Sequence, residues 1–225
     1  MDENRTKTNG NRAFIFDMDG TLVDNMKFHS QAWMALFESL GIYLDADEFQ
    51  RRTAGKTNPE ILRKFTGRDL SEDEIQVLSD QKENFYRDLY RPHLKATTGL
   101  RPFLEQAQEQ HIPMGLATAA GKENIAFVLH GLKLEDFFSA IVGAEDIKKG
   151  KPDPEIFIKS ATKLHIQPQD CIVFEDSLFG IEAAHRAGMR AVFITTSHQP
   201  EALGDQPAIM FSVPDFSTLD IKDLK

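Results

Sequence analysis

The stretch AFIFDMDGT at residues 13–21 decides the fold prediction, because a continuous apolar run ends abruptly in two carboxylates and a glycine. An apolar run without polar alternation is typical of a strand in a parallel sheet that is covered on both faces. Open sheets of this kind bind ligands at the carboxyl ends of their strands, where Asp17 and Asp19 stand. If the chain stays extended through Asp19, both carboxylates project to the same side, and Gly20 lets the backbone turn away. A plain surface turn also favours Asp and Gly, so this stretch alone leaves that alternative open.

The rest of the chain alternates between short apolar runs and helical patterns. With the first run included, parallel strands are predicted at 13–16, 114–117, 140–142, 171–174, 191–194 and 209–211. Helices are predicted at 99–110, 154–164 and 177–187, with Gly188 as the stop signal of the last. This alternation predicts an α/β fold with a doubly wound, Rossmann-like parallel sheet.

A long helical stretch separates the first predicted strand from the second. Apolar residues between His29 and Leu40 recur at helical spacing, and Ser71 with Glu74 forms a capping box for a later helix. We therefore predict an inserted helical cap domain at 27–95, with ordinary crossover helices as the alternative. The α/β core domain then comprises 13–26 and 96–225, and residues 1–12 are predicted to be a disordered tail.

Composition limits the classes of partner. The 225 residues carry 26 Lys and Arg against 35 Asp and Glu, a formal charge of −9, which disfavours nucleic acid and anionic membranes. No stretch approaches the roughly 20 apolar residues of a membrane span, and the first residues lack a secretory pattern. Cys171 is the only cysteine, which excludes an intramolecular disulfide framework. We expect a cytoplasmic protein that is a monomer.

A second pair of carboxylates, Glu175 and Asp176, follows the predicted strand at 171–174. Asp176 could also cap the next helix, and for this pair alone that is the better interpretation. Together with Asp17 and Asp19, however, four carboxylates meet at one edge of the sheet. Such a concentration of charge requires a hard divalent cation, and oxygen-only ligands indicate Mg²⁺.

Two further residues suit a phosphate group. Thr118 ends the strand at 114–117, where a hydroxyl and free backbone N–H groups at a strand-to-helix junction fit a phosphate oxygen. Lys151 lies in the loop KGKPDP at 149–154, which two prolines stiffen, and could reach a phosphoryl group. Taken singly, Thr118 could be a helix cap and Lys151 a solvated lysine.

Taken in order, these four segments resemble the motifs of the haloacid dehalogenase-like superfamily of phosphoaspartyl transferases. DMDGTLVD at 17–24 matches the first motif, Thr118 the second, Lys151 the third and Glu175-Asp176 the fourth. FEDS at 174–177, with the glycine and isoleucine at 180–181, is similar to the β-phosphoglucomutase-like subgroup. The helical insert stands where this superfamily carries its small cap.

The resemblance implies a role for each motif. Asp17 is the nucleophile that becomes an aspartyl phosphate, and Asp19 protonates the leaving oxygen and later activates the attacking water or alcohol. Asp17, the backbone carbonyl of Asp19 and Asp176 hold Mg²⁺, with Glu175 beside them. Thr118, the adjoining Ala119 and Lys151 bind the phosphoryl oxygens.

The cap is expected to decide the substrate. His29 could orient Asp19 or sense closure of the cap, or could simply pack near Trp33. Gly55, Lys56 and Lys82 are the expected substrate contacts. In the mutase pattern a basic residue precedes the cap glycine and an arginine follows it, whereas this chain has Ala54 and Asn58 at those places. Losing these cations weakens the grip on a distal phosphate, which favours a phosphohydrolase of small phosphorylated metabolites, such as sugar phosphates, over a phosphohexomutase.

Two alternative functional classes, signalling domains and nucleotide-binding proteins, have sequence features that differ from those of this chain. A receiver-like signalling domain also combines acidic residues, a Thr and a Lys, but lacks an insert after the first strand and its phosphorylated Asp does not begin a D-x-D pair. A dinucleotide-binding protein would carry G-x-G-x-x-G after a strand, and an ATP-binding P-loop would carry G-x-x-x-x-G-K-[ST]; the chain has neither.

Overall fold

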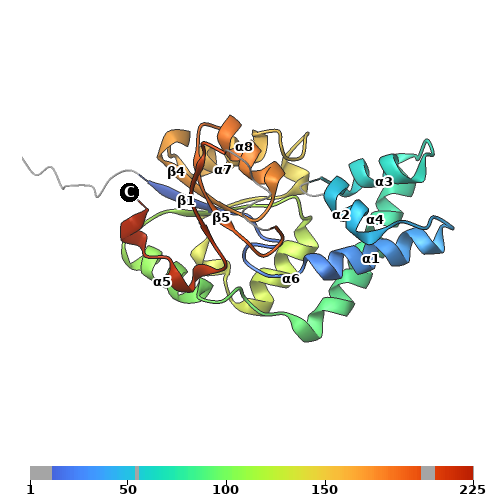
Figure 1. Ribbon diagram of the computed structural model, residues 1–225, viewed down its shortest axis with the longest axis horizontal. Coiled ribbons are helices and arrows are strands. Elements are labelled where there is room, and N and C mark those ends of the chain that lie inside the picture. The colour runs from blue at the N-terminus through green and yellow to red at the C-terminus, as the bar shows by residue number, and fades with distance from the viewer. Residues whose placement is uncertain (1–11, 54–55, 199–205, 225) are drawn as a thin grey trace, which may run out of the picture.

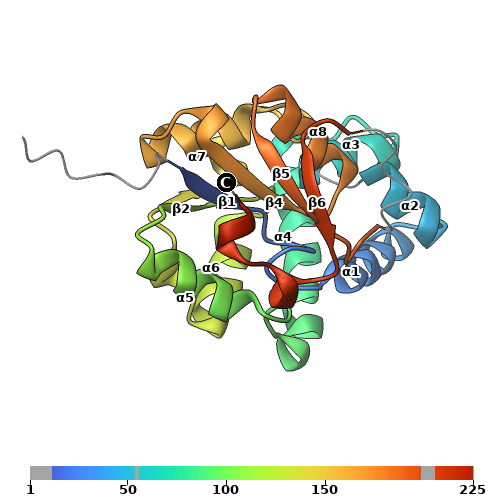
Figure 2. The ribbon, with the colours of Figure 1, turned by 60° about the vertical axis from the view of Figure 1, so that its left-hand side comes forward.

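Six parallel strands form one sheet in the order β3-β2-β1-β4-β5-β6 in the computed structural model, which describes residues 12–53, 56–198 and 206–224. Figures 1 and 2 show the twisted sheet between two layers of helices, with a helical cap projecting from one end. The strands are β1 (Ala13–Phe16), β2 (Met114–Ala117), β3 (Ala140–Val142), β4 (Cys171–Glu175), β5 (Arg190–Ile194) and β6 (Ile209–Val213). The predicted doubly wound α/β fold is confirmed.

The helices follow the predicted alternation closely. They are α1 (Met26–Ser39), α2 (Ala46–Thr53), α3 (Asn58–Thr66), α4 (Glu72–Tyr90), α5 (Leu100–Glu109), α6 (Lys122–Leu132), α7 (Glu155–Leu164) and α8 (Leu178–Arg186). Short 3₁₀ helices are η1 (Arg91–His93), η2 (Glu135–Phe137), η3 (Ala144–Asp146), η4 (Pro168–Asp170), η6 (Phe216–Thr218) and η7 (Ile221–Asp223). None of the helices in the described ranges is long and apolar enough to cross a membrane.

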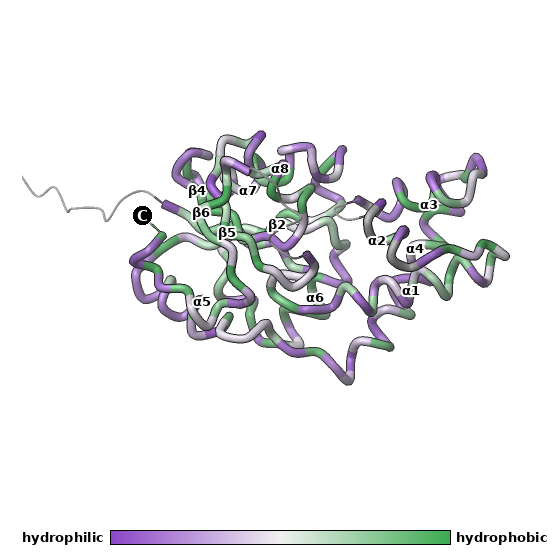
Figure 3. Tube along the Cα trace, in the orientation of Figure 1, coloured by the Kyte–Doolittle hydropathy of each residue, from purple (hydrophilic) through white to green (hydrophobic). Residues whose placement is uncertain are grey.

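The central strands of the sheet contribute alternate residues to two apolar layers. Phe14 and Phe16 of β1 pack with α5 and α6, whereas Ala13 and Ile15 pack with α7 and α8. Figure 3 shows the resulting concentration of hydrophobic residues along the strands. The cover is incomplete at the margins of the sheet, where Ile141 of β3 and Phe211 of β6 are each 36% exposed. The expectation that every strand is covered on both faces is therefore wrong for these two strands, which form the edges of the sheet.

Helix caps explain two boundaries. The predicted capping box of α4 is confirmed, because Ser71 Oγ accepts from the Glu74 N–H and the Glu74 carboxylate accepts from the Ser71 N–H. At α8 the interpretation of Asp176 as the cap is wrong. Ser177 is the N-cap, and its hydroxyl accepts a hydrogen bond of 3.0 Å from the Gly180 N–H. The Asp176 carboxylate therefore does not cap α8 and is available for another contact.

The cap consists of α1 to α4 and has an apolar centre of its own, which packs Trp33, Phe37 and Phe49 with five aliphatic residues. At the base of the cap, Phe28, Tyr86 and Tyr90 pack instead with the core beneath the sheet. The separate apolar centre supports our proposed cap domain within residues 27–95, and the packing of Phe28, Tyr86 and Tyr90 shows where that domain rests on the core.

Most of the predicted tail, residues 1–11, lies outside the described residues. Its last residue, Arg12, donates a hydrogen bond of 2.7 Å to the Leu224 carbonyl and lies over the Phe14 ring. Arg12 therefore belongs to the folded core, and the predicted tail boundary is too late by one residue.

Candidate active site

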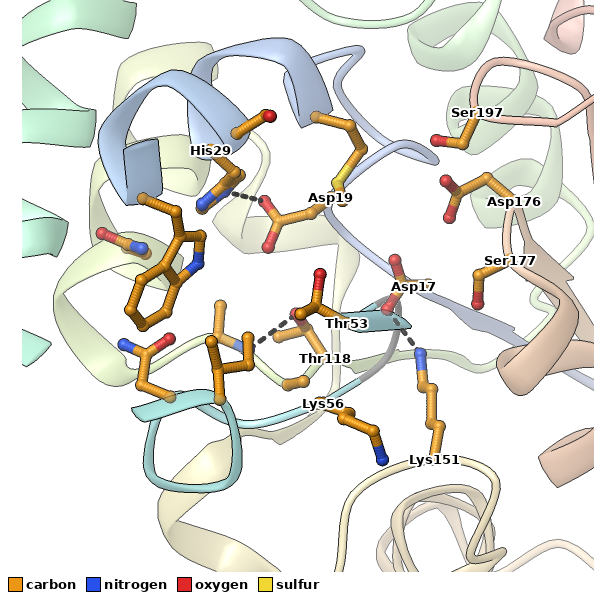
Figure 4. Close-up of a pocket in the computed structure, with 18 of the residues that line it drawn as sticks. Asp17, Asp19, His29, Thr53, Lys56, Thr118, Lys151, Asp176, Ser177 and Ser197 are labelled. Atoms are coloured by element: carbon orange, nitrogen blue, oxygen red, sulfur yellow. Dashed lines mark hydrogen bonds and ion pairs between the residues drawn. The ribbon is translucent and has the colours of Figure 1, made fainter. Parts of the chain in front are cut away.

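The candidate site lies at the carboxyl ends of the three central strands. Asp17 follows β1, Thr118 follows β2 and Glu175 ends β4, and β1 pairs with both of the others. The chain continues to one side of β1 through β2 and β3, and to the other through β4 and β5, so this is the switch point where open sheets bind ligands. The cap covers the site and leaves a cavity of about 110 Å³ lined by residues of both parts (Figure 4).

Three buried carboxylates meet in this cavity. Oxygen atoms of Asp17, Glu175 and Asp176 lie within 4.8 Å of one another, and none of these residues is more than 6% exposed. The Lys151 ammonium donates to Asp17 Oδ1 at 2.6 Å and to Glu175 Oε1 at 2.7 Å. Oxygen-only donors this close together suit a hard divalent cation, which would replace their mutual repulsion with coordination.

The electrostatics of the cluster reflect unbalanced negative charge. Burial, with Glu175 and Asp19 nearby, raises the pKa of Asp17 to about 8 even though Lys151 opposes the shift. Burial and the neighbouring Glu175 and Asp17 also raise the pKa of Asp176 well above its ordinary value. Burial alone would lower the pKa of Lys151, but the carboxylates of Asp17 and Glu175 outweigh it and raise that pKa. One ammonium therefore does not neutralise three carboxylates, and the site favours a further cation.

Glycines allow the backbone to approach these carboxylates. Gly20 has a φ of +86°, and a Cβ there would collide with the Asp176 carboxylate. A Cβ on Gly180 would collide with the Glu175 carboxylate, whose Oε2 also accepts from the Ser177 N–H at 2.6 Å. Both residues were noted in the sequence, Gly20 as the turn after Asp19 and Gly180 as part of the pattern similar to the β-phosphoglucomutase-like subgroup.

The Asp19 side chain points away from the carboxylate cluster. Its Oδ1 accepts from Asn25 Nδ2 at 2.6 Å and lies 3.4 Å from His29 Nε2 (Figure 4). Burial would raise the pKa of Asp19, but His29 and Asn25 more than offset it, so the pKa is lowered. The Asp19 side chain is therefore not a member of the metal-binding cluster, and only its backbone carbonyl remains as the proposed ligand.

Asn25 is a site residue that the sequence analysis missed. It occupies the N-cap position of α1, yet its side chain makes no capping bond. Instead its amide nitrogen contacts both Asp19 and the Tyr86 hydroxyl, the latter at 2.6 Å, and its amide oxygen accepts from the Gly20 N–H at 3.2 Å. An Asn just before a predicted helix normally indicates a cap, so the sequence offered no signal for this role.

His29 is held between core and cap. Its Nδ1 lies 2.7 Å from the Lys82 ammonium, and its ring stacks on Tyr86 with a centroid separation of 3.7 Å. Since an ammonium can only donate, Nδ1 must accept and the ring proton lies on Nε2, facing Asp19. This geometry supports the predicted orienting role of His29 rather than simple packing near Trp33.

Two backbone N–H groups of the predicted phosphate-binding loop already donate to other atoms of the protein. The Thr118 N–H donates to the Val142 carbonyl at 3.0 Å, and the Ala120 N–H donates to Thr118 Oγ1 at 3.1 Å. The expectation of free N–H groups is therefore wrong for these two residues, because β3 and the turn use them. Among the described residues, the Ala119 N–H has no hydrogen-bond partner and remains available to a ligand.

The remaining predicted cap contacts fall into two groups. Ala54 and Gly55 lie outside the described residues. Lys56 lines the cavity, with its ammonium 5.8 Å from the centroid of the Phe179 ring at the start of α8. Lys82 also lines the cavity but is only 2% exposed and is engaged by His29 and by Glu83.

Three more polar residues of the cavity were not predicted as site residues. Glu83 of α4 accepts from the side-chain amides of Asn58 and Asn124, each at 2.7 Å. Asn124 is on α6 of the core, 41 residues away along the chain, so only the docked cap brings these groups together. The sequence carries no local pattern that would reveal such a contact.

Comparison with known proteins agrees with this geometry. The family model for haloacid dehalogenase-like hydrolases matches residues 14–194. A phosphorylated carbohydrates phosphatase of Thermotoga maritima is 30% identical over 90% of this chain and 94% of that protein. The chloroplastic 5-amino-6-(5-phospho-D-ribitylamino)uracil phosphatase of Arabidopsis thaliana is also 30% identical over 93% of this chain, but the match spans 57% of that longer protein.

A solved structure shows the same architecture. The β-phosphoglucomutase of Clostridium difficile superimposes with a TM-score of 0.83 at 30% identity, covering 95% of each chain. The sequence match, the shared fold and the ordered carboxylates at the switch point agree, and the chain belongs to the haloacid dehalogenase-like hydrolase family, among relatives of the β-phosphoglucomutase-like type.

Proposed function

We propose that the chain is a phosphatase that hydrolyses phosphate monoesters of small metabolites, such as sugar phosphates, through an aspartyl phosphate on Asp17. The observation that carries this proposal is the buried Asp17 carboxylate, paired with Lys151 and placed beside Glu175 and Asp176 under the cap. The related phosphatases of Thermotoga maritima and Arabidopsis thaliana support the same reaction class.

In the first half-reaction an Asp17 oxygen attacks phosphorus and the ester P–O bond breaks. The leaving alkoxide takes a proton from Asp19, which His29 and Asn25 hold in place. Because these contacts lower the pKa of Asp19 in the free protein, Asp19 must take up that proton when the phosphate dianion binds. In the second half-reaction water attacks phosphorus, Asp19 accepts its proton, and the acyl phosphate bond breaks to regenerate Asp17 and release inorganic phosphate. Each half-reaction balances without an oxidant or reductant.

Asp17, Asp176 and the backbone carbonyl of Asp19 would hold a divalent cation, with Glu175 beside them, and the oxygen-only donor set favours Mg²⁺. Bound there, the cation would reduce the repulsion between the attacking carboxylate and a phosphate dianion. Thr118, the Ala119 N–H and Lys151 would bind the phosphoryl oxygens. Repulsion between two unit negative charges at about 4 Å amounts to several kcal/mol at an effective dielectric near 20, so a carboxylate that faces a phosphate dianion needs both Lys151 and the divalent cation.

A phosphohexomutase is the second candidate, because the β-phosphoglucomutase of Clostridium difficile shares this fold at 30% identity. A mutase must hold a second phosphate with cap cations. Here Asn58 stands at the expected arginine position and donates to Glu83, which favours the hydrolase. We also retain the predictions of a cytoplasmic, monomeric enzyme, which cell fractionation and light scattering would test.

A panel of phosphorylated metabolites assayed with Mg²⁺ tests the function. We expect release of inorganic phosphate from p-nitrophenyl phosphate and a higher kcat/KM for one or more sugar phosphates. β-Glucose 1-phosphate provides the discriminating substrate. Its conversion to glucose 6-phosphate faster than phosphate release, with stimulation by glucose 1,6-bisphosphate, would favour the mutase. If no ester in the panel released phosphate, the proposed phosphatase activity would be contradicted.

A further inference from the structure

Three polar side chains, Asn58, Glu83 and Asn124, close the cavity where the cap meets the core, and we call them the polar wall. Glu83 accepts at Oε1 from Asn58 Nδ2 of α3 and at Oε2 from Asn124 Nδ2 of α6, each at 2.7 Å. Asn124 is in turn held by Arg87, which donates to its Oδ1 at 2.7 Å from one turn further along α4. Asn58, Glu83 and Asn124 line both the catalytic cavity and the wider groove outside it, so they form the partition between the two.

The carboxylate in this wall is ionised at neutral pH. Burial would raise the pKa of Glu83, but the adjacent Lys82 ammonium and the hydrogen bonds from Lys82 and Asn58 outweigh it and hold the pKa at about 2. The ammonium contributes a hydrogen bond of 2.9 Å to Glu83 Oε1 and is otherwise occupied by His29 Nδ1. Lys82 is therefore a paired cation, not the free cation that a distal phosphate would need.

The other lysines among the described residues that line the cavity belong to its phosphate-transfer half. Lys151 contacts Asp17 and Glu175, and the Lys56 ammonium lies 5.8 Å from the centroid of the Phe179 ring, in the first turn of the helix that follows Asp176 and Ser177. Figure 4 shows the Lys56 and Lys151 side chains in the same part of the site. A substrate whose reacting phosphate is held by these cations would direct its other end away from them, toward Glu83 and its two amides.

We propose that Glu83 is a specificity-determining residue that selects phosphomonoesters with an uncharged polyhydroxyl remainder and rejects substrates with a second phosphate. A substrate hydroxyl can donate to a carboxylate oxygen or accept from an amide, whereas a phosphate there would face the Glu83 carboxylate, whose neighbouring cation Lys82 is already paired with Glu83 and His29. This inference rests on the proposed phosphatase function and adds the substrate class to it.

The experiment compares kcat/KM for fructose 1-phosphate and fructose 1,6-bisphosphate in wild type, Glu83→Gln and Asp80→Asn, with p-nitrophenyl phosphate as the general substrate. Gln keeps the shape and one acceptor oxygen, which can serve Asn58 or Asn124 but not both, while removing the charge. Asp80 lies on the same helix three residues earlier, faces the outer groove and does not line the catalytic cavity. Asp80→Asn therefore removes the same charge outside the proposed contact, and thermal melting checks that each variant is folded.

We expect wild type to prefer the monophosphate by about tenfold or more, and Glu83→Gln to reduce that preference by about tenfold through a higher kcat/KM for the bisphosphate. Asp80→Asn should leave the preference within about twofold of wild type. An unchanged preference in Glu83→Gln, an equal change in Asp80→Asn, or wild-type activity on p-nitrophenyl phosphate but on neither sugar would overturn the inference while leaving the phosphatase intact. If wild type hydrolyses none of the three esters, the proposed function itself fails, and this inference fails with it.

Discussion

The ammonium of Lys151 lies 2.6 Å from Oδ1 of Asp17, although 134 residues separate them along the chain. The contact joins the loop before α7 to the end of β1, inside a site where Lys151 is only 3% exposed. It places the one cation of this cluster on the proposed nucleophile and leaves Glu175 as its second partner. The following predictions depend on this arrangement.

Lys151→Met should reduce kcat for phosphate release by about a hundredfold to a thousandfold, because a preorganised charge next to the transferring phosphate is lost. The matched control is Lys149→Met, in the same loop but with a side chain 76% exposed, and its kcat should stay close to that of wild type. Steady-state kinetics at saturating Mg²⁺ measures both. If Lys151→Met kept more than about a tenth of wild-type kcat, Lys151 would have no direct part in the reaction.

The raised pKa of Asp17 gives a stability prediction for the metal-free protein. The ordinary pKa is 3.8 and the folded-state pKa is about 8, so between these values the folded state binds more protons than the unfolded state. The free energy of unfolding should therefore fall as pH rises from about 4 to about 8, by at most about 1.4 kcal/mol per pH unit from this group. Urea unfolding across that range, in EDTA, measures the slope for wild type and Asp17→Asn.

We expect the downward slope to be shallower in Asp17→Asn, which carries no titratable group at that place. Added Mg²⁺ should raise the melting temperature of wild type at pH 7.5, because a ligand that binds only the folded state stabilises it. The same slope in both proteins would show that Asp17 is not the group whose proton is retained.

Gly20→Ala tests the close approach of backbone and carboxylate. The new Cβ would collide with Asp176, in addition to the strain of a φ of +86°. Gly41→Ala is the matched control, because its φ is +75° but nothing lies within 4 Å of the added Cβ. The control should cost about 1 kcal/mol of stability, whereas Gly20→Ala should also raise the Mg²⁺ concentration required for half-maximal rate. Equal metal dependence in the two variants would remove Asp176 from the metal site.

The contact between cap and core can be tested at Asn124. Its side-chain amide is satisfied by Glu83 and Arg87 of α4, so Asn124→Ala leaves both without that partner and should cost about 1–3 kcal/mol of stability. Asn84→Ala removes an exposed Arg87 partner on α4 itself and should have little effect. Thermal or urea unfolding compares them. A loss no larger for Asn124→Ala than for Asn84→Ala would mean that this contact does not hold the cap.

The sequence predicted the sheet well because buried parallel strands are short, continuous apolar runs with clear ends. The bounds of β1, β2 and β3 are as predicted, while β4, β5 and β6 are longer by one or two residues. The additions at β4 and β5 are the charged Glu175 and Arg190, which a hydropathy pattern excludes although the hydrogen-bond ladder continues through them.

Local signals were less informative where two neighbours compete for one role. Asp176 and Ser177 are both good N-caps, and only the fold shows that Ser177 caps α8 while Asp176 joins the carboxylate cluster. The motif residues Asp17, Thr118, Lys151 and Glu175 could be found because each follows a strand or a stiff loop. Glu83 and Asn124 could not, because their contact exists only between a cap helix and a core helix brought together by docking.

The most direct measurement of the central proposal is the rate of phosphate release by Asp17→Asn with Mg²⁺, beside wild type, after mass spectrometry has excluded deamidation. The substitution keeps the shape of the side chain and removes the attacking charge, and it relieves repulsion among buried carboxylates, so the variant should remain folded. We predict a fall in kcat of about a thousandfold or more with an unchanged or higher melting temperature. Retention of more than a few per cent of wild-type kcat by the folded variant would contradict the assignment of Asp17 as the nucleophile.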